Sequence, residues 1–132
     1  MRKALFLIAI IISTVFSYSA EEVDYFSIAR NELKKGNIDK ALENFETASR
    51  KPQAKPEVFL LLGRTAHGAM CSELAHNSFS HIFPKISPGD RKDYFFIAAE
   101  SAAFINAFDT AENYLKEINN HGIRVTKKKL EK

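Results

Sequence analysis

Residues 41–48 read Ala-Leu-Glu-Asn-Phe-Glu-Thr-Ala and place Ala41, Phe45 and Ala48 at intervals of four and three residues. Positions i, i+4 and i+7 lie on one face of an α-helix. A small residue at the first position lets the preceding helix come close, and the larger apolar side chain then fills the space beside it. This stretch therefore predicts a helix that packs tightly against the helix before it.

The same spacing occurs three times in the chain. The copies start at residues 41, 75 and 111, so their offsets are 34 and 36 residues, and the later copies are Ala75, Phe79, Ile82 and Ala111, Leu115, Ile118. Each copy follows an apolar pair and then a small residue, namely Tyr25, Ile28, Ala29; Phe59, Leu62, Gly63; and Phe95, Ala98, Ala99. A period of this length indicates stacked helical hairpins.

Local signals predict six helices, near residues 21–35, 38–50, 56–69, 72–83, 89–105 and 108–119. Gly36 and Gly122 are typical helix stops, and Pro56 fits a first helical turn. Ser87 with Asp90 three residues later has the pattern of a helix N-cap. The two extra residues of the second offset fall in the loop 84–88. We therefore expect an all-α protein.

Over residues 22–119 this pattern resembles the tetratricopeptide repeat (TPR). The first unit matches best, with Gly36-Asn37-Ile38-Asp39 at the turn and Pro52 after the second helix, whereas Met70-Cys71-Ser72 replaces the usual glycine-containing turn in the second unit. The resemblance implies a right-handed α-solenoid of three hairpins within residues 20–122, at about 22–54, 56–87 and 89–121. The alternative is an unrelated helical bundle whose periodicity is accidental.

In that family the first helices of the hairpins line a concave groove that binds an extended peptide or a partner helix. The positions that the resemblance assigns to this groove are Phe26, Arg30, Leu33, Lys34, Leu60, Arg64, His67, Phe96, Glu100 and Ala103. Arg30 and Arg64 are 34 residues apart, so we expect them side by side, where two guanidinium groups could hold a carboxylate. Alternatively, each Arg pairs with Glu32, Glu57 or Glu100 on a solvated face.

The N-terminus has the pattern of a secretory signal peptide at residues 1–19. Met1-Arg2-Lys3 is positive, residues 4–16 are almost entirely apolar, and Ser17 and Ser19 supply the small residues for cleavage after Ser19. We therefore expect an exported protein, in the periplasm of a Gram-negative-type bacterium. The alternative is an uncleaved anchor in the inner membrane.

The charge is concentrated at the C-terminus. Removal of Arg2 and Lys3 leaves 17 basic against 16 acidic residues, and residues 124–132 alone carry a net charge of +4. The remaining body is thus acidic, which argues against a nucleic-acid partner. Residues 123–132 form a basic tail whose candidate contacts with an anionic membrane or cell-wall polymer are Arg124, Lys127, Lys128 and Lys129.

No spacing in the sequence indicates catalysis, a cofactor or a metal site. Cys71 is the single cysteine, and the four histidines have no third ligand at a suitable spacing. We therefore interpret the chain as a binding module and not as an enzyme: a scaffold or adaptor for another envelope protein or peptide. Two alternatives remain, a carrier of a small ligand in a pocket of Phe26, Leu60, Phe96 and Phe104, and a protein that acts through its basic tail.

Overall fold

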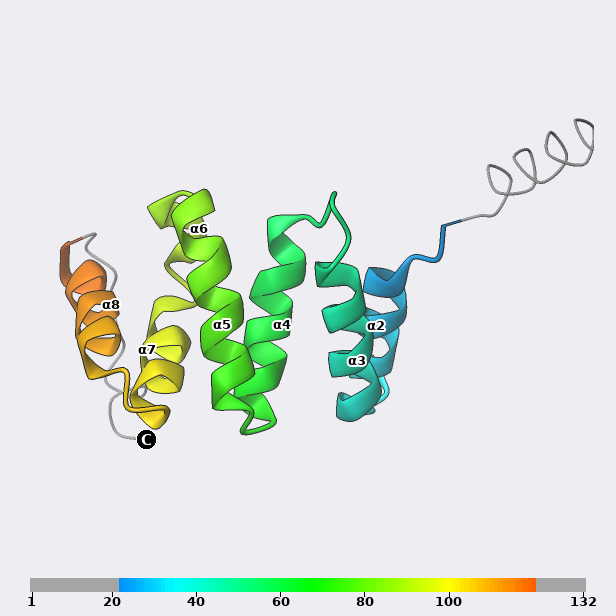
Figure 1. The fold of residues 1–132 in the computed structure, drawn as a ribbon, viewed down its shortest axis with the longest axis horizontal. Helices are drawn as coiled ribbons and strands as arrows, with labels where there is room; N and C mark the ends of the chain where they lie inside the picture. Colours follow the sequence, from blue (N-terminus) through cyan, green and yellow to red (C-terminus); the bar gives the residue numbers. More distant parts are fainter. Residues whose placement is uncertain (1–21, 121–132) are drawn as a thin grey trace, which may run out of the picture.

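The computed structural model describes residues 22–120 (Figure 1), and that part of the chain contains helices and turns but no strand. The all-α prediction is confirmed. The helices are α2 (Tyr25–Lys34), α3 (Ile38–Ser49), α4 (Pro56–Gly68), α5 (Ser72–Ile82), the 3-10 helix η1 (Phe83–Lys85), α6 (Pro88–Arg91), α7 (Phe95–Phe104) and α8 (Phe108–Asn120).

Consecutive helices form three antiparallel pairs, α2 with α3, α4 with α5 and α7 with α8. The pairs follow one another along the long axis of the molecule (Figure 1). Neighbouring pairs meet where α3 packs on α4 and where α5 and α4 pack on α7. No pair could bury its apolar surface alone, so the stack shares one core.

The three turns within the pairs have the same backbone geometry. Gly36, Met70 and Asn106 all have positive φ, at 81°, 63° and 63°. In each turn the residue after this one donates its N–H to a carbonyl five residues earlier, over 2.8–2.9 Å. This pattern is the Schellman motif, which satisfies the last carbonyls of a helix. Met70 and Asn106 therefore adopt the conformation that Gly36 adopts without strain.

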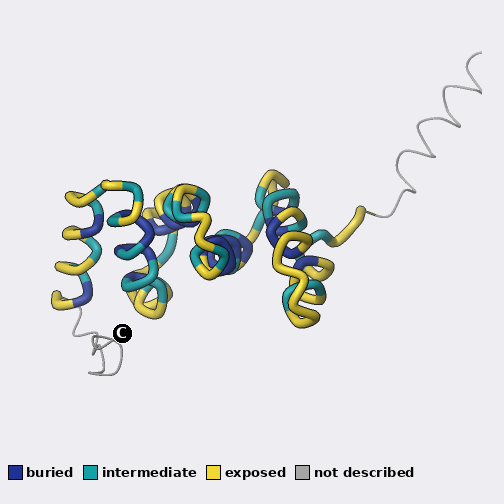
Figure 2. The backbone as a smooth tube through the Cα atoms, turned by 90° about the horizontal axis from the view of Figure 1, so that it is seen from below, coloured by how far each residue is buried: buried dark blue, intermediate teal, exposed yellow. Residues whose placement is uncertain are grey.

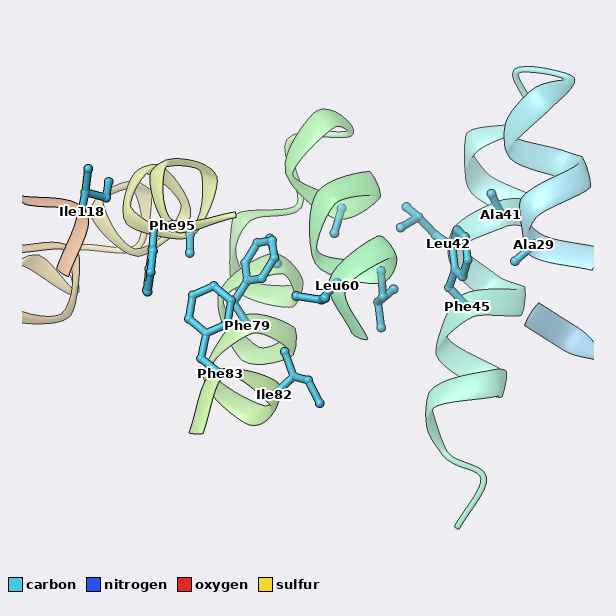
Figure 3. Packing of buried hydrophobic residues seen from close by; sticks show 14 residues of the cluster. Ala29, Ala41, Leu42, Phe45, Leu60, Phe79, Ile82, Phe83, Phe95 and Ile118 are labelled. Atoms are coloured by element: carbon cyan, nitrogen blue, oxygen red, sulfur yellow. The ribbon is translucent and has the colours of Figure 1, made fainter. Parts of the chain in front are cut away.

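The small residues and the rings predicted to face each other do so in the core. Phe45 and Phe79 are fully buried, as are the small residues of the first helices (Figure 3). The closest approach is between α4 and α5, where a Cβ added to Gly63 would lie 2.7 Å from the Phe79 ring. No side chain larger than hydrogen fits there unless the ring moves.

Aromatic rings join the second pair to the third. The Phe83 ring lies 5.3 Å from the ring of Phe95 and 5.3 Å from that of Tyr114, both edge-on. Edge-to-face ring pairs at this distance stabilise the fold in addition to the stabilisation from the apolar area they bury. Figure 2 shows the result: buried residues lie where helices face each other, and exposed residues lie on the turns and outer faces.

Two predicted helices differ from the structure. The helix expected at 21–35 begins only at Tyr25, because the Asp24 carboxylate caps it by accepting from the Ser27 N–H at 3.1 Å. The helix expected at 89–105 is interrupted at residues 92–94. α6 is a single turn that ends at Arg91, whose guanidinium donates to the Ile86 carbonyl at 2.7 Å.

Several expectations concern residues outside the described range. The signal peptide 1–19, Gly122 and the basic tail 123–132 with Arg124, Lys127, Lys128 and Lys129 all lie there. Within residues 22–120, no helix has the length and apolar character needed to cross a membrane.

Candidate functional site

The residues assigned to the groove lie on α2, α4 and α7, the first helices of the three pairs. Residues four apart share one side of a helix. We call this surface the first-helix face, and it comprises Phe26, Arg30 and Lys34 of α2, Leu60, Arg64 and His67 of α4, and Phe96, Glu100 and Phe104 of α7.

On α2, an aromatic ring supports a cation. The Phe26 ring lies 6.0 Å from the ring of buried Phe45, and the Arg30 guanidinium lies over the Phe26 ring, 5.6 Å from its centroid. A cation in this position is attracted by the ring quadrupole. Lys34 follows one turn later and is exposed. Arg30 is therefore oriented by stacking and not by a carboxylate.

Leu60 and Phe96 depart from the expected exposure. Leu60 is only 9% exposed and belongs to the core, and half-buried Phe96 packs against that core. The reason is that neighbouring pairs meet through α4, which has apolar contacts on more than one side. Leu60 therefore contributes to packing, while Arg64 on the next turn of α4 is exposed.

His67 connects α4 to α7. Its Nδ1 lies 3.1 Å from the Ser101 Oγ, and its Nε2 lies 3.3 Å from a carboxylate oxygen of Glu100. Ser101 is 34 residues after His67, whereas equivalent positions of α4 and α7 are 36 residues apart, so the repeat spacing did not indicate this contact. These contacts show that α4 and α7 meet at His67, Glu100 and Ser101.

The combination of Ser101, His67 and Glu100 has the residue types of a hydrolytic triad. Ser101, however, is fully buried, and its hydroxyl donates to the Ile97 carbonyl at 2.9 Å. A nucleophile must reach its substrate, and this hydroxyl is enclosed. The geometry supports a hydrogen-bonded junction between two helices.

The acidic residues near the first-helix face have partners other than the arginines. Glu32 accepts from the Asn37 side chain at 2.7 Å and lies 3.8 Å from Lys35, and the bond from Asn37 lowers the pKa of Glu32. Glu100 is bound by His67. Within residues 22–120, Arg30, Lys34 and Arg64 make no ion pair.

The structure does not bring every predicted residue together. α4 and α7 are in direct contact, whereas the first pair meets the second mainly through α3. The placement of Arg30 beside Arg64 stays a prediction. Phe26 also lines a cavity of about 330 Å³ with Ala48, Lys51 and Val58, but neither Leu60 nor Phe96 contributes to it.

His76 and His81 of α5, and Cys71 just before it, lie outside the first helices. His81 stacks on Phe59 at 4.5 Å between ring centroids and lies 3.1 Å from the Lys85 Nζ. Cys71 is exposed at the second turn. Among residues 22–120, no three His, Cys, Asp or Glu side chains are grouped so that they could hold a metal ion.

Comparisons with family models, with curated proteins and with solved structures find no match for this chain.

Proposed function

We propose that the protein is an exported TPR-like repeat protein, a right-handed α-solenoid of three hairpins that binds another envelope protein or peptide through its first-helix face. Support for the repeat comes from the three Schellman turns, whose positive-φ residues are 34 and 36 residues apart. Those offsets are the same as the offsets of the Ala-x3-Phe/Leu-x2-Ala/Ile pattern.

The observation that carries the binding role is the charge on the first-helix face. Arg30, Lys34 and Arg64 are exposed there and are unpaired within the described residues. Two of the three acids on α2, α4 and α7, Glu32 and Glu100, are bound elsewhere. An unpaired cation at a protein surface can hold a carboxylate, and Arg does so with two parallel hydrogen bonds.

The second helices differ from the first in net charge. α2, α4 and α7 together carry three bases, Arg30, Lys34 and Arg64, and three acids, which gives a net charge of zero. α3, α5 and α8 carry seven acids and only two bases, Lys40 and Lys116, which gives a net charge of −5. A carboxylate-bearing partner would therefore be repelled by the second helices and not by the first. Such asymmetry selects the docking face and increases the association rate.

The test is recovery of a partner from a cell-envelope extract of the producing organism by immobilised mature protein. We expect the double variant Arg30→Glu, Arg64→Glu to lose the partner that the wild type retains. Arg50→Glu is the matched control, because Arg50 is an exposed arginine at the end of α3, outside the first-helix face. Equal recovery by the wild type and the double variant would overturn the proposal.

A further inference from the structure

The first-helix face changes in character between the second and third pairs. Two sets of equivalent positions show the change: Arg30 and Arg64 correspond to Glu100, and Lys34 and Gly68 correspond to Phe104. On this face α4 thus presents the cation Arg64, and α7 ends in the aromatic ring of Phe104. Phe104 is 61% exposed, which is unusual for so large an apolar side chain.

Glu100 does not form an ion pair with Arg64. The Glu100 carboxylate is held by His67 at 3.3 Å. The contacts of His67 with Glu100 and Ser101 also fix α4 directly beside α7. A single extended ligand can therefore reach both Arg64 and Phe104.

The distance between Arg64 and Phe104 determines how long a ligand must be to contact both. The two helices run in the same direction (Figure 1), and they are in direct contact with each other. Packed helices are typically 8–10 Å apart, and one helical turn rises about 5.4 Å, so roughly 10–15 Å separates Arg64 from Phe104. An extended chain covers that distance in roughly three to four residues.

We infer that the partner segment is an extended peptide that carries an apolar side chain and an acidic side chain roughly three to four residues apart. The apolar side chain covers Phe104, and the acidic one binds Arg64. Further acidic residues on the Arg64 side would extend toward Arg30 and Lys34. This inference rests on the proposed function, because it specifies the partner of the same face.

The experiment measures fluorescence anisotropy with a labelled Gly/Ser peptide that carries one phenylalanine and, four residues later, one glutamate. Two matched peptides replace either the phenylalanine with serine or the glutamate with lysine. We expect each replacement to weaken binding by about tenfold, which corresponds to about 1.4 kcal/mol for a lost apolar contact or a reversed charge.

Protein variants assign the two contacts. Arg64→Glu should remove the preference for glutamate over lysine, and Phe104→Ser should remove the preference for phenylalanine over serine. Both side chains are exposed, so the fold should persist, which circular dichroism checks. Arg50→Glu should change neither preference.

Selection from a random peptide library distinguishes a failure of this inference from a failure of the proposed function. Enriched peptides that perturb the amide signals of α4 and α7 but lack the acidic and apolar pair would overturn this inference and leave the proposed function standing. A library from which no peptide binds these helices would overturn both.

Discussion

Phe79 and Leu115 have equivalent positions in the second and third pairs but very different surroundings. Phe79 is fully buried, and its ring lies 5.4 Å from that of Phe83 and 6.1 Å from that of Tyr94. Leu115 is 46% exposed. The second pair is followed by α7, whereas within residues 22–120 no helix follows α8. The same pattern therefore stabilises the fold only where the next pair covers it.

Truncation of these two residues should give the largest contrast. Phe79→Ala removes a fully buried ring and leaves a cavity, so we expect the free energy of unfolding to fall by about 3–5 kcal/mol. Leu115→Ala should cost about 1 kcal/mol or less, because half of its surface is already in water. Urea denaturation of both variants measures the difference, and similar losses would mean that Leu115 is covered in solution.

A second contrast concerns two glycines of α4. Gly63→Ala forces the Phe79 ring to move, and overpacking of this kind typically costs about 1–3 kcal/mol. A Cβ at Gly68 meets nothing within 4 Å, so Gly68→Ala should stabilise the protein by about 0.5–1 kcal/mol through helix propensity. Thermal unfolding would show shifts of opposite sign. A stabilising Gly63→Ala would contradict the close approach of α4 and α5.

The turns allow a third comparison. Met70 has the left-handed conformation without the freedom of glycine, so Met70→Gly should stabilise the protein by up to about 1 kcal/mol. Gly36→Ala places the same strain in the first turn and should destabilise it by a similar amount. Denaturant titration of both variants tests the claim that the two turns are equivalent, and changes of the same sign would refute it.

The smallest expected effect appears at alkaline pH. Burial raises the pKa of Tyr114 above its ordinary value of 10.0. The folded protein then holds the phenolic proton more tightly than the unfolded chain does, so stability is unaffected below pH about 10 and falls as the pH rises above it. Between pH 9 and 11, the free energy of unfolding of Tyr114→Phe should fall less steeply than that of the wild type. Parallel pH profiles for the two proteins would exclude this role for Tyr114.

The spacing of apolar residues predicted most of the fold because it indicates which side chains face a neighbouring helix. Ala41, Phe45 and Phe79 had to be buried in any stack of this period, and they are. The pattern could not show that α4 packs on more than one side, which buries Leu60. Nor could it show the break before α7, where the side chain of Arg91 donates to a backbone carbonyl.

The candidate surface was predicted less completely, for a related reason. The sequence placed Arg30, Arg64 and His67 on the first helices, which the structure confirms. The partners of these side chains depend on rotamers and on helix contacts that no spacing encodes. Thus the stacking of Arg30 on Phe26 and the bond between His67 and Ser101 became visible only in three dimensions.

The three Schellman turns also supply matched reporters of local opening. The backbone amides of Asn37, Cys71 and Ala107 make chemically equivalent bonds over 2.8–2.9 Å, one in each pair. Their hydrogen-exchange rates can therefore be compared with one another once intrinsic rates are removed. In a stack that opens from its ends, the Cys71 amide should exchange most slowly, and the ratio of the other two would identify the end that unfolds first.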